Sequence, residues 1–202
     1  MKKITIALIM VISLIAPIQT MAESVTQNGT IIEPLEQNIE QIIDEITSEP
    51  RPINSDAIQN VKEYISEYFG NLGYDNIEYQ KFEYNDENNE NAIRHSSQAD
   101  VFLASTAENA IVDGIGENII VTKNSSIDTT KNLIISAHYD SAEDSVGAND
   151  NGSGVAAVLE LARILKDTEM PYNVKFILFS GEEKYMLGSR WYVGNLSEDE
   201  RK

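Results

Sequence analysis

The sequence contains no cysteine among its 202 residues. This absence excludes disulfide bonds, a cysteine nucleophile, zinc sites built from thiolates and a lipid-modified cysteine. The composition is otherwise that of a globular protein, with 42% hydrophobic and 24% charged residues. The chain must therefore be held together by its apolar core or by metal ions.

Positive charge is also scarce, because 15 lysines and arginines stand against 33 aspartates and glutamates, for a formal net charge of -18. Such an excess of acid argues against nucleic acid or an anionic membrane surface as a partner, since both would repel the chain. A cationic ligand, such as a metal ion or the ammonium end of a peptide, would suit it. A solvated acidic surface nevertheless explains the charge alone better than any ligand does.

The N-terminus has the pattern of a secretory signal peptide. Lys2 and Lys3 precede an apolar run over residues 4–18, and the small residues Thr20 and Ala22 fit a cleavage site after Ala22. A membrane-spanning helix needs about 20 apolar residues, so the run is short for a retained anchor, which is the alternative. We expect a secreted protein with no stable membrane association after cleavage of the signal.

The spacing of apolar residues predicts one folded domain in which strands and helices alternate. Helices are expected over residues 35–46, 55–72 and 154–166, with a last one beginning near Leu187, and strands over 77–84, 118–122, 133–137 and 174–179. The alternation in the second half predicts an α/β sheet with parallel strands. In such sheets the functional residues gather at the carboxyl ends of the strands.

The first candidate motif, Ser136–Ser141, follows the expected strand 133–137. Side chains two residues apart on an extended chain point the same way, so Asp140 can lie beside His138. A carboxylate in that place fixes the tautomer of the imidazole and makes its free nitrogen a better metal ligand. A structural histidine with a neighbouring acid would give the same pattern.

The second motif is the glycine-rich stretch Gly147–Gly154, which leads directly into the helix expected over 154–166. Its glycines permit a tight turn, from which Asp150 would project ahead of the helix N-terminus. A carboxylate has two oxygens, so one aspartate can bridge two cations. A turn with a helix N-cap explains the same residues, since Asn, Asp, Ser and Gly all favour such positions.

The third motif places Glu182 and Glu183 just after the apolar strand 174–179. Two adjacent carboxylates at the end of a buried strand are unusual as purely structural residues. On an extended chain they would face opposite ways, so a turn must aim both into one cleft. We then expect one glutamate to bind metal and the other to act on water. A solvent-facing pair that starts the next helix is the alternative.

Taken together, the three motifs resemble the two-zinc exopeptidases of metallopeptidase clan MH, family twenty-eight. That family includes bacterial leucyl aminopeptidases, aminopeptidase Y and glutamate carboxypeptidase. The resemblance is specific over about residues 117–195 and looser over 51–84. It implies a three-layer α/β/α zinc-peptidase fold with a mostly parallel, mixed central sheet that is incomplete at the C-terminus. Residues 1–22 would then be the signal peptide, 23–50 an N-terminal segment with one amphipathic helix, and 51–202 the N-terminal part of the peptidase domain.

Carried over position by position, the resemblance implies roles for five residues. His138 would bind one zinc ion, Asp150 would bridge two, and Glu183 would bind the second. Glu182 would be the general base, and Asp140 would orient His138. The implied activity is that of an aminopeptidase acting on peptides with a free N-terminus, with two Zn²⁺ ions in a complete site. The lack of an inserted domain between His138 and Glu183 favours aminopeptidase over carboxypeptidase action.

The chain departs from the family pattern in one respect. The family completes its site with another aspartate and a second histidine downstream of the glutamate pair, whereas this sequence ends at Lys202. Its only other histidine, His95, lies upstream in a polar stretch, where a surface role is expected. Each zinc would then have two protein ligands, while catalytic zinc sites usually have three. We therefore expect a truncated chain whose own activity is open, and whose strand 174–179 exposes an apolar face or an edge.

Two further functions remain as alternatives. The chain would also fit a non-catalytic exported protein, either a degenerate peptidase or a metal-binding module that keeps these residues without assembling the site. A serine hydrolase is less well supported, because Gly152-Ser153-Gly154 lacks the Gly-x-Ser-x-Gly pattern of the nucleophile elbow.

Overall fold

The computed structural model describes residues 25–27, 30–32, 35–85, 113–198 and 200, in two compact units, Met1–Glu33 and Pro34–Lys202. In the first unit, β1 (Val25–Gln27) pairs with β2 (Thr30–Ile32) in an antiparallel ladder. The expected signal peptide and His95 lie outside the described residues. Among the described helices, none has both the length and the apolar character needed to cross a membrane.

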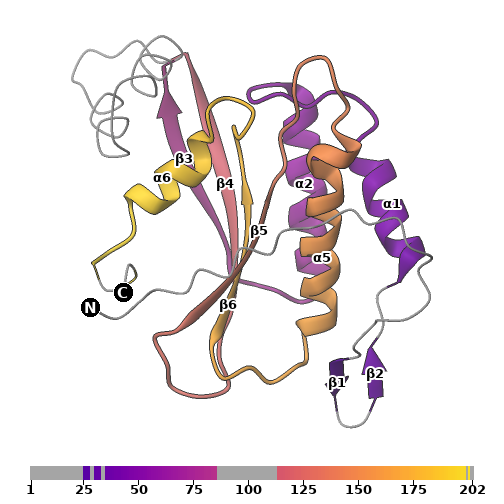
Figure 1. Ribbon diagram of the computed structural model, residues 1–202, viewed down its shortest axis with the longest axis vertical. Helices are drawn as coiled ribbons and strands as arrows, with labels where there is room; N and C mark the ends of the chain where they lie inside the picture. The colour runs from indigo at the N-terminus through magenta and orange to yellow at the C-terminus, as the bar shows by residue number, and fades with distance from the viewer. Residues whose placement is uncertain (1–24, 28–29, 33–34, 86–112, 199, 201–202) are drawn as a thin grey trace, which may run out of the picture. The chain divides into compact units, whose positions relative to one another are not determined.

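The second unit is built on a four-stranded sheet (Figure 1). The strands are, in spatial order, β3 (Ile77–Tyr84), β4 (Gly114–Lys123), β6 (Asn173–Phe179) and β5 (Asn132–His138). The pairs β3–β4 and β4–β6 are antiparallel, while β5–β6 is parallel. The mixed α/β sheet is thus confirmed, although the parallel part is smaller than the sequence predicts. A parallel pair needs a crossover connection, which α5 (Ser153–Leu165) supplies between β5 and β6.

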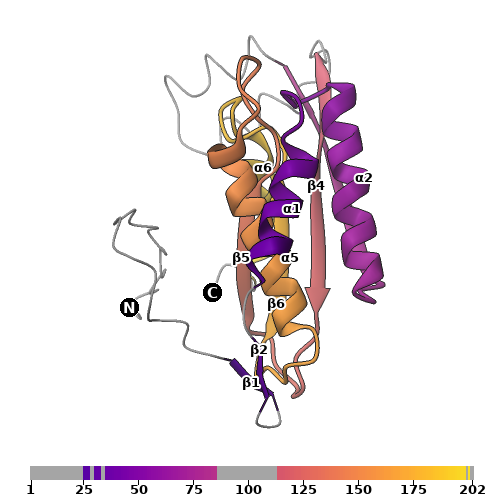
Figure 2. The same ribbon diagram turned by 90° about the vertical axis from the view of Figure 1, so that its right-hand side faces the viewer.

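Helices cover both faces of this sheet, which gives the expected three layers (Figures 1 and 2). On one face lie α1 (Glu36–Ile46), α2 (Asp56–Asn71) and α5, and on the other lies α6 (Leu187–Gly194). The first face holds the main core, in which Phe69 of α2 and Leu159 of α5 pack with Phe176 of β6. On the second face Tyr192 of α6 packs with Ile120 and Ile177.

Local sequence signals explain where α2 begins and ends. The Ser55 side chain accepts a hydrogen bond of 3.1 Å from the Ile58 N–H, which satisfies one of the free donors at the helix start. On the apolar stripe of α2, the side chains of Ile65 and Phe69 are fully buried. Past the helix end, Gly73 has a φ of +78°, the left-handed conformation typical of a residue that follows a helix.

The sequence analysis predicts an exposed apolar face or edge for strand 174–179. Among the described residues this strand, β6, has neither, so that prediction is wrong. Residues Val174, Phe176, Ile177 and Leu178 of β6 are each 0% exposed, because β4 and β5 flank the strand and helices cover both of its faces. The two edges of the described sheet are β3 and β5, and on β5 the apolar side chains of Leu133 and Ile134 are 38% and 46% exposed.

A buried asparagine joins the sheet to the turn that follows β6. Asn118 of β4 is 0% exposed, and its Nδ2 donates to the Gly188 carbonyl at 2.9 Å while its Oδ1 accepts the Ser180 N–H at 3.2 Å. The Gly188 N–H donates in turn to the Ser180 carbonyl at 3.0 Å. A Cβ added at Gly188 would lie 2.2 Å from Asn118 Oδ1 and 2.4 Å from the Ser180 carbonyl oxygen. Only glycine lets α6 start this close to the turn.

We therefore expect Gly188→Ala to lower the free energy of unfolding by about 1–3 kcal/mol, because the added methyl group overpacks a backbone contact. Gly70→Ala is the matched control, since an added Cβ at this exposed position in α2 has no neighbour within 4 Å. That substitution should be neutral or stabilise by up to about 1 kcal/mol. Urea unfolding of the metal-free variants measures both effects. A Gly188→Ala variant as stable as the parent would contradict the role given to this contact.

Candidate metal centre

The three predicted motifs meet at one end of the sheet. His138 is the last residue of β5, and Glu182 and Glu183 follow β6, whose Phe179 pairs with His138 in the parallel ladder. Asp150 lies in a short irregular helical turn, η1 (Ala148–Gly152), directly before α5. Since parallel strands place their carboxyl ends side by side, the β5–α5–β6 unit brings all four side chains to the same place.

The contacts of His138 define the centre. One ligand atom from each of His138, Glu182 and Glu183 lies within 4.8 Å of the others. His138 Nε2 is 3.0 Å from Asp150 Oδ1 and 3.8 Å from Glu182 Oε2. On the other side of the ring, Nδ1 lies 3.2 Å from the main-chain oxygen of Asp140 and 3.5 Å from its Oδ1. A proton on Nδ1 directed at Asp140 would leave the Nε2 lone pair facing the carboxylates.

Asp140 also holds the glutamate turn, which the sequence did not reveal. Its carboxylate is 1% exposed, and its two oxygens each accept a backbone N–H at 3.1 Å, Oδ1 from Glu182 and Oδ2 from Glu183. Gly181, with a φ of +71°, provides the bend that directs both N–H groups toward Asp140. The sequence predicts a turn that aims both glutamates into one cleft. Asp140, just after the end of β5, holds this turn through its two carboxylate oxygens.

The electrostatics of the centre favour a bound cation. Burial lowers the pKa of His138, but the carboxylates of Asp140, Glu182 and Asp150 outweigh burial and raise this pKa to about 8. The pKa of Glu183 is also raised, first by burial and then by the negative charges of Asp150, Asp140 and Glu182, against the opposing effect of His138. Carboxylates that repel one another in a partly buried cluster are typical of functional sites.

The donor set fits a zinc ion. Imidazole nitrogen and carboxylate oxygen are both zinc ligands, and two donors each about 2.1 Å from a tetrahedral zinc lie about 3.4 Å apart. The 3.0 Å between His138 Nε2 and Asp150 Oδ1 is close to that separation. The side chain of Asp150 is 76% exposed and that of Glu182 is 41% exposed, so both can adjust to an ion. Among the described residues, one group of three or more histidine and acidic side chains has its ligand atoms within 4.8 Å of one another, namely His138, Glu182 and Glu183.

Two polar residues outside the predicted set support the centre. Asn118 holds Ser180, next to the glutamate turn, and the buried Arg51 contacts the loop between Asp140 and Asp150. The sequence offered a weak signal for Arg51, because the looser part of the family resemblance begins with this residue. Asn118 gave none, since its partners Gln80, Ser180 and Gly188 lie far from it along the chain.

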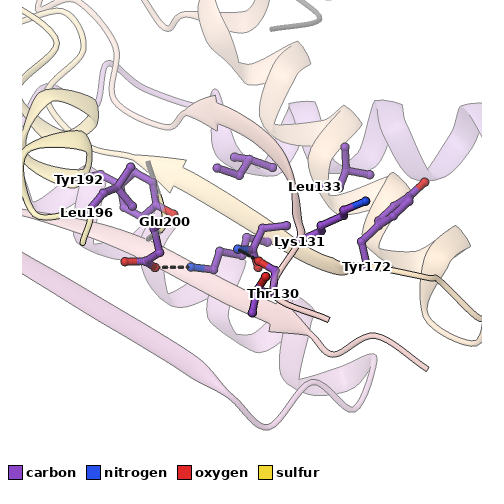
Figure 3. A pocket seen from close by; sticks show the side chains of 10 residues that line it. Thr130, Lys131, Leu133, Tyr172, Tyr192, Leu196 and Glu200 are labelled. Carbon is purple, nitrogen blue, oxygen red and sulfur yellow. Dashed lines mark hydrogen bonds and ion pairs between the residues drawn. The ribbon is translucent and has the colours of Figure 1, made fainter. Parts of the chain in front are cut away.

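A separate hollow of about 600 Å³ lies beside β5 (Figure 3). Thr130, Leu133 and Tyr172 line it at or next to the amino ends of β5 and β6, and Tyr192 of α6 and the later residues Leu196 and Glu200 complete the lining. A 3.4 Å ion pair joins Lys175 to Glu200. The candidate metal ligands follow the carboxyl ends of the same strands. The hollow is therefore not part of the metal centre.

The raised pKa of His138 predicts a pH-dependent stability of the metal-free chain. Because the folded state binds this proton more tightly than the unfolded state, whose pKa is near 6.5, the stabilisation is complete below pH 6.5 and is lost as the pH rises through about 8. A shift of this size corresponds to about 2 kcal/mol. Urea unfolding with a chelator should therefore show a larger loss of stability between pH 6 and pH 9 in the parent than in His138→Gln. An equal loss in both would rule out His138 as the source.

Comparisons with known proteins agree with this geometry. Residues 118–202 match the model of peptidase family M28. Aminopeptidase YwaD of Bacillus subtilis is 44% identical over 94 residues, which cover 46% of this chain and 21% of that protein. A vacuolar membrane protease of Schizosaccharomyces japonicus is 32% identical over 151 residues, which cover 75% of this chain and 16% of that protein. The chain thus matches about a fifth or less of the length of these relatives.

The fold agrees as well. A solved zinc aminopeptidase from Bacillus subtilis superimposes with a TM-score of 0.66 at 19% identity, over 83% of this chain and 67% of that one. At that identity the likeness concerns the fold, and it confirms the mixed α/β architecture. The matched family stretch contains His138, Asp140, Asp150, Glu182 and Glu183. Over residues 118–202, the chain is therefore similar to peptidase family M28.

Proposed function

We propose that this chain is a zinc-dependent metallopeptidase of the aminopeptidase type, which hydrolyses peptide bonds with an activated water. The observation that carries the proposal is the convergence of His138, Glu182 and Glu183 within 4.8 Å, with Asp150 3.0 Å from His138. The family of residues 118–202 and the named aminopeptidase relative support it.

The proposal gives each side chain a role. His138, Asp150 and Glu183 would hold zinc, and in a complete site Asp150 would be shared by two ions. When bound, zinc supplies a Lewis acid that polarises the scissile carbonyl and makes a water more acidic. Glu182 accepts a proton from the attacking water and returns it to the leaving amine. Asp140 fixes the ring of His138 from one side and the backbone of both glutamates from the other.

We further propose peptides with a free N-terminus as substrates, and export through a cleaved signal peptide. A cluster of carboxylates in a chain of net charge -18 attracts a peptide's ammonium group as well as a metal ion. Lys2, Lys3 and the apolar run 4–18 support export. In this proposal residues 1–22 are the signal peptide, 23–50 an N-terminal segment and 51–202 the peptidase domain.

A non-catalytic metal-binding module is the second candidate. It rests on the same observation, since His138, Asp150 and the glutamates would bind a metal ion whether or not a peptide is hydrolysed. This module would bind zinc through the same residues but would not turn over a peptide. The two candidate functions differ in the role of Glu182, which is catalytic only in the peptidase.

Zinc titration and a peptidase assay on three proteins test the proposal. The parent should bind zinc, and Asp150→Ala should weaken binding by at least about tenfold, because it removes a direct ligand. Glu182→Gln keeps the shape of the side chain and should retain zinc, but should lower kcat on a leucine anilide by about 10²–10⁴-fold.

The outcomes separate the two candidates. No zinc binding by the parent would refute the metal centre. Zinc binding with no turnover, or with turnover that Glu182→Gln leaves unchanged, would identify a binding module instead of a peptidase of this mechanism.

A further inference from the structure

We infer that Arg51 is a positioning residue of the metal centre, which holds the turn carrying Asp150 in place opposite His138. Arg51 lies between α1 and α2, about 90 residues before the site, and touches none of the proposed zinc ligands directly in its hydrogen bonds. The inference rests on the proposed zinc site, but its test includes a measurement that needs no metal.

The guanidinium group of Arg51 contacts both ends of the loop that joins His138 to Asp150. The residue is 0% exposed. Its Nε donates to the Tyr139 carbonyl at 2.7 Å, directly after His138, and its Nη2 donates to the Gly147 carbonyl at 3.1 Å, three residues before Asp150. Arg51 therefore sets the separation between the two ends of this loop.

The backbone of Arg51 fixes the loop at a further point. Its N–H donates to Ser141 Oγ at 2.9 Å, and its carbonyl accepts the Ser141 N–H at 3.2 Å. Nη1 of the same guanidinium donates to the Val146 carbonyl. The side chain and the main chain of one residue thus hold four positions along a segment of nine residues, from Tyr139 to Gly147.

The Gly147 carbonyl links Arg51 to the turn itself. Besides the Arg51 bond, it accepts the Gly152 N–H at 2.9 Å, which closes the turn that carries Asp150. Gly147 has a φ of +60°, and a Cβ there would lie 2.5 Å from the Asp150 carbonyl oxygen and 3.3 Å from Arg51 Nη2. Glycine is needed at this position for the turn to pack against Arg51. The path from Arg51 to Asp150 is therefore a continuous series of backbone contacts.

The chemistry of the side chain explains why an arginine occupies this position. Three carbonyls in fixed directions match the planar fork of a guanidinium, whereas the ammonium group of lysine is a single donor centre on a flexible stem. Burial lowers the pKa of Arg51, and the negative charges of Asp140 and Glu183 oppose that effect. The cation therefore lies behind the acidic cluster, where its charge also reduces the repulsion among the carboxylates.

Positioning and charge predict opposite effects on zinc affinity. If Arg51 acted only through its charge, its removal would take a cation away from the neighbourhood of the metal and tighten zinc binding. If Arg51 positions Asp150, its removal loosens the turn and weakens zinc binding. Arg51→Met removes the charge and places an apolar side chain at this position. Arg51→Lys keeps the charge but loses the planar guanidinium fork.

The first test is a zinc titration of both variants against the parent. We expect the Kd to rise about tenfold or more in Arg51→Met, and also to rise in Arg51→Lys despite its retained charge. Arg163→Met is the control, because Arg163 pairs with Glu160 of the same helix, α5. It should leave the Kd near the parental value. Unchanged or tighter binding by Arg51→Met would overturn the inference.

The second test needs no metal, and the β6 amides report whether the fold of the variant is intact. In the metal-free parent, hydrogen exchange of the Gly152 N–H and of Arg51 Nε–H should be slow, because both are donated to carbonyls of the loop. In Arg51→Lys the Gly152 amide should exchange faster, with β6 amides unchanged. Rapid exchange in the parent would overturn the inference even if zinc binds. Failure of the parent to bind zinc would instead refute the proposed function and leave this result to stand.

Discussion

The candidate centre depends on one buried carboxylate. Asp140 is 1% exposed, and its two oxygens receive the N–H groups of Glu182 and Glu183 while its main-chain oxygen lies 3.2 Å from His138 Nδ1. A buried charge is costly unless it is paired and hydrogen-bonded, and these contacts meet that requirement. The same contacts tie the end of β5 to the turn after β6. They therefore help to set the direction of the two glutamates relative to His138.

The βαβ topology makes such a link possible. β5 and β6 are adjacent and parallel, so residues 42 or 43 positions apart in the sequence meet at neighbouring strand ends. The crossover helix α5 starts at the same end, which places Asp150 next to His138. Outside this unit, Arg51 and Asn118 contribute through hydrogen bonds to backbone groups. The unit thus supplies the ligands, and the rest of the domain holds their loops.

Much of this could be predicted from the sequence, because the elements have clear periodicity and the ligands carry distinctive chemistry. The strand expected over 77–84 has those bounds in the structure, whereas β4 begins at Gly114, four residues before the predicted start. Its first residues gain strand structure from pairing with β3, which local sequence does not encode. The antiparallel β4–β6 pair was not predictable for the same reason. The supporting role of Arg51 escaped prediction because its guanidinium group donates to carbonyls, which every residue carries.

The balance of charge at the centre links proton and metal binding. In the metal-free chain a cation is already favoured at this position, since the carboxylates raise the pKa of His138 to about 8 despite its burial. A proton on Nε2 would bridge toward Asp150 Oδ1 at 3.0 Å, along the direction in which a metal ion would be held. Proton and metal therefore compete for the same nitrogen. Zinc binding at this nitrogen would exchange one cation for another among the carboxylates, so it would release a proton below about pH 8.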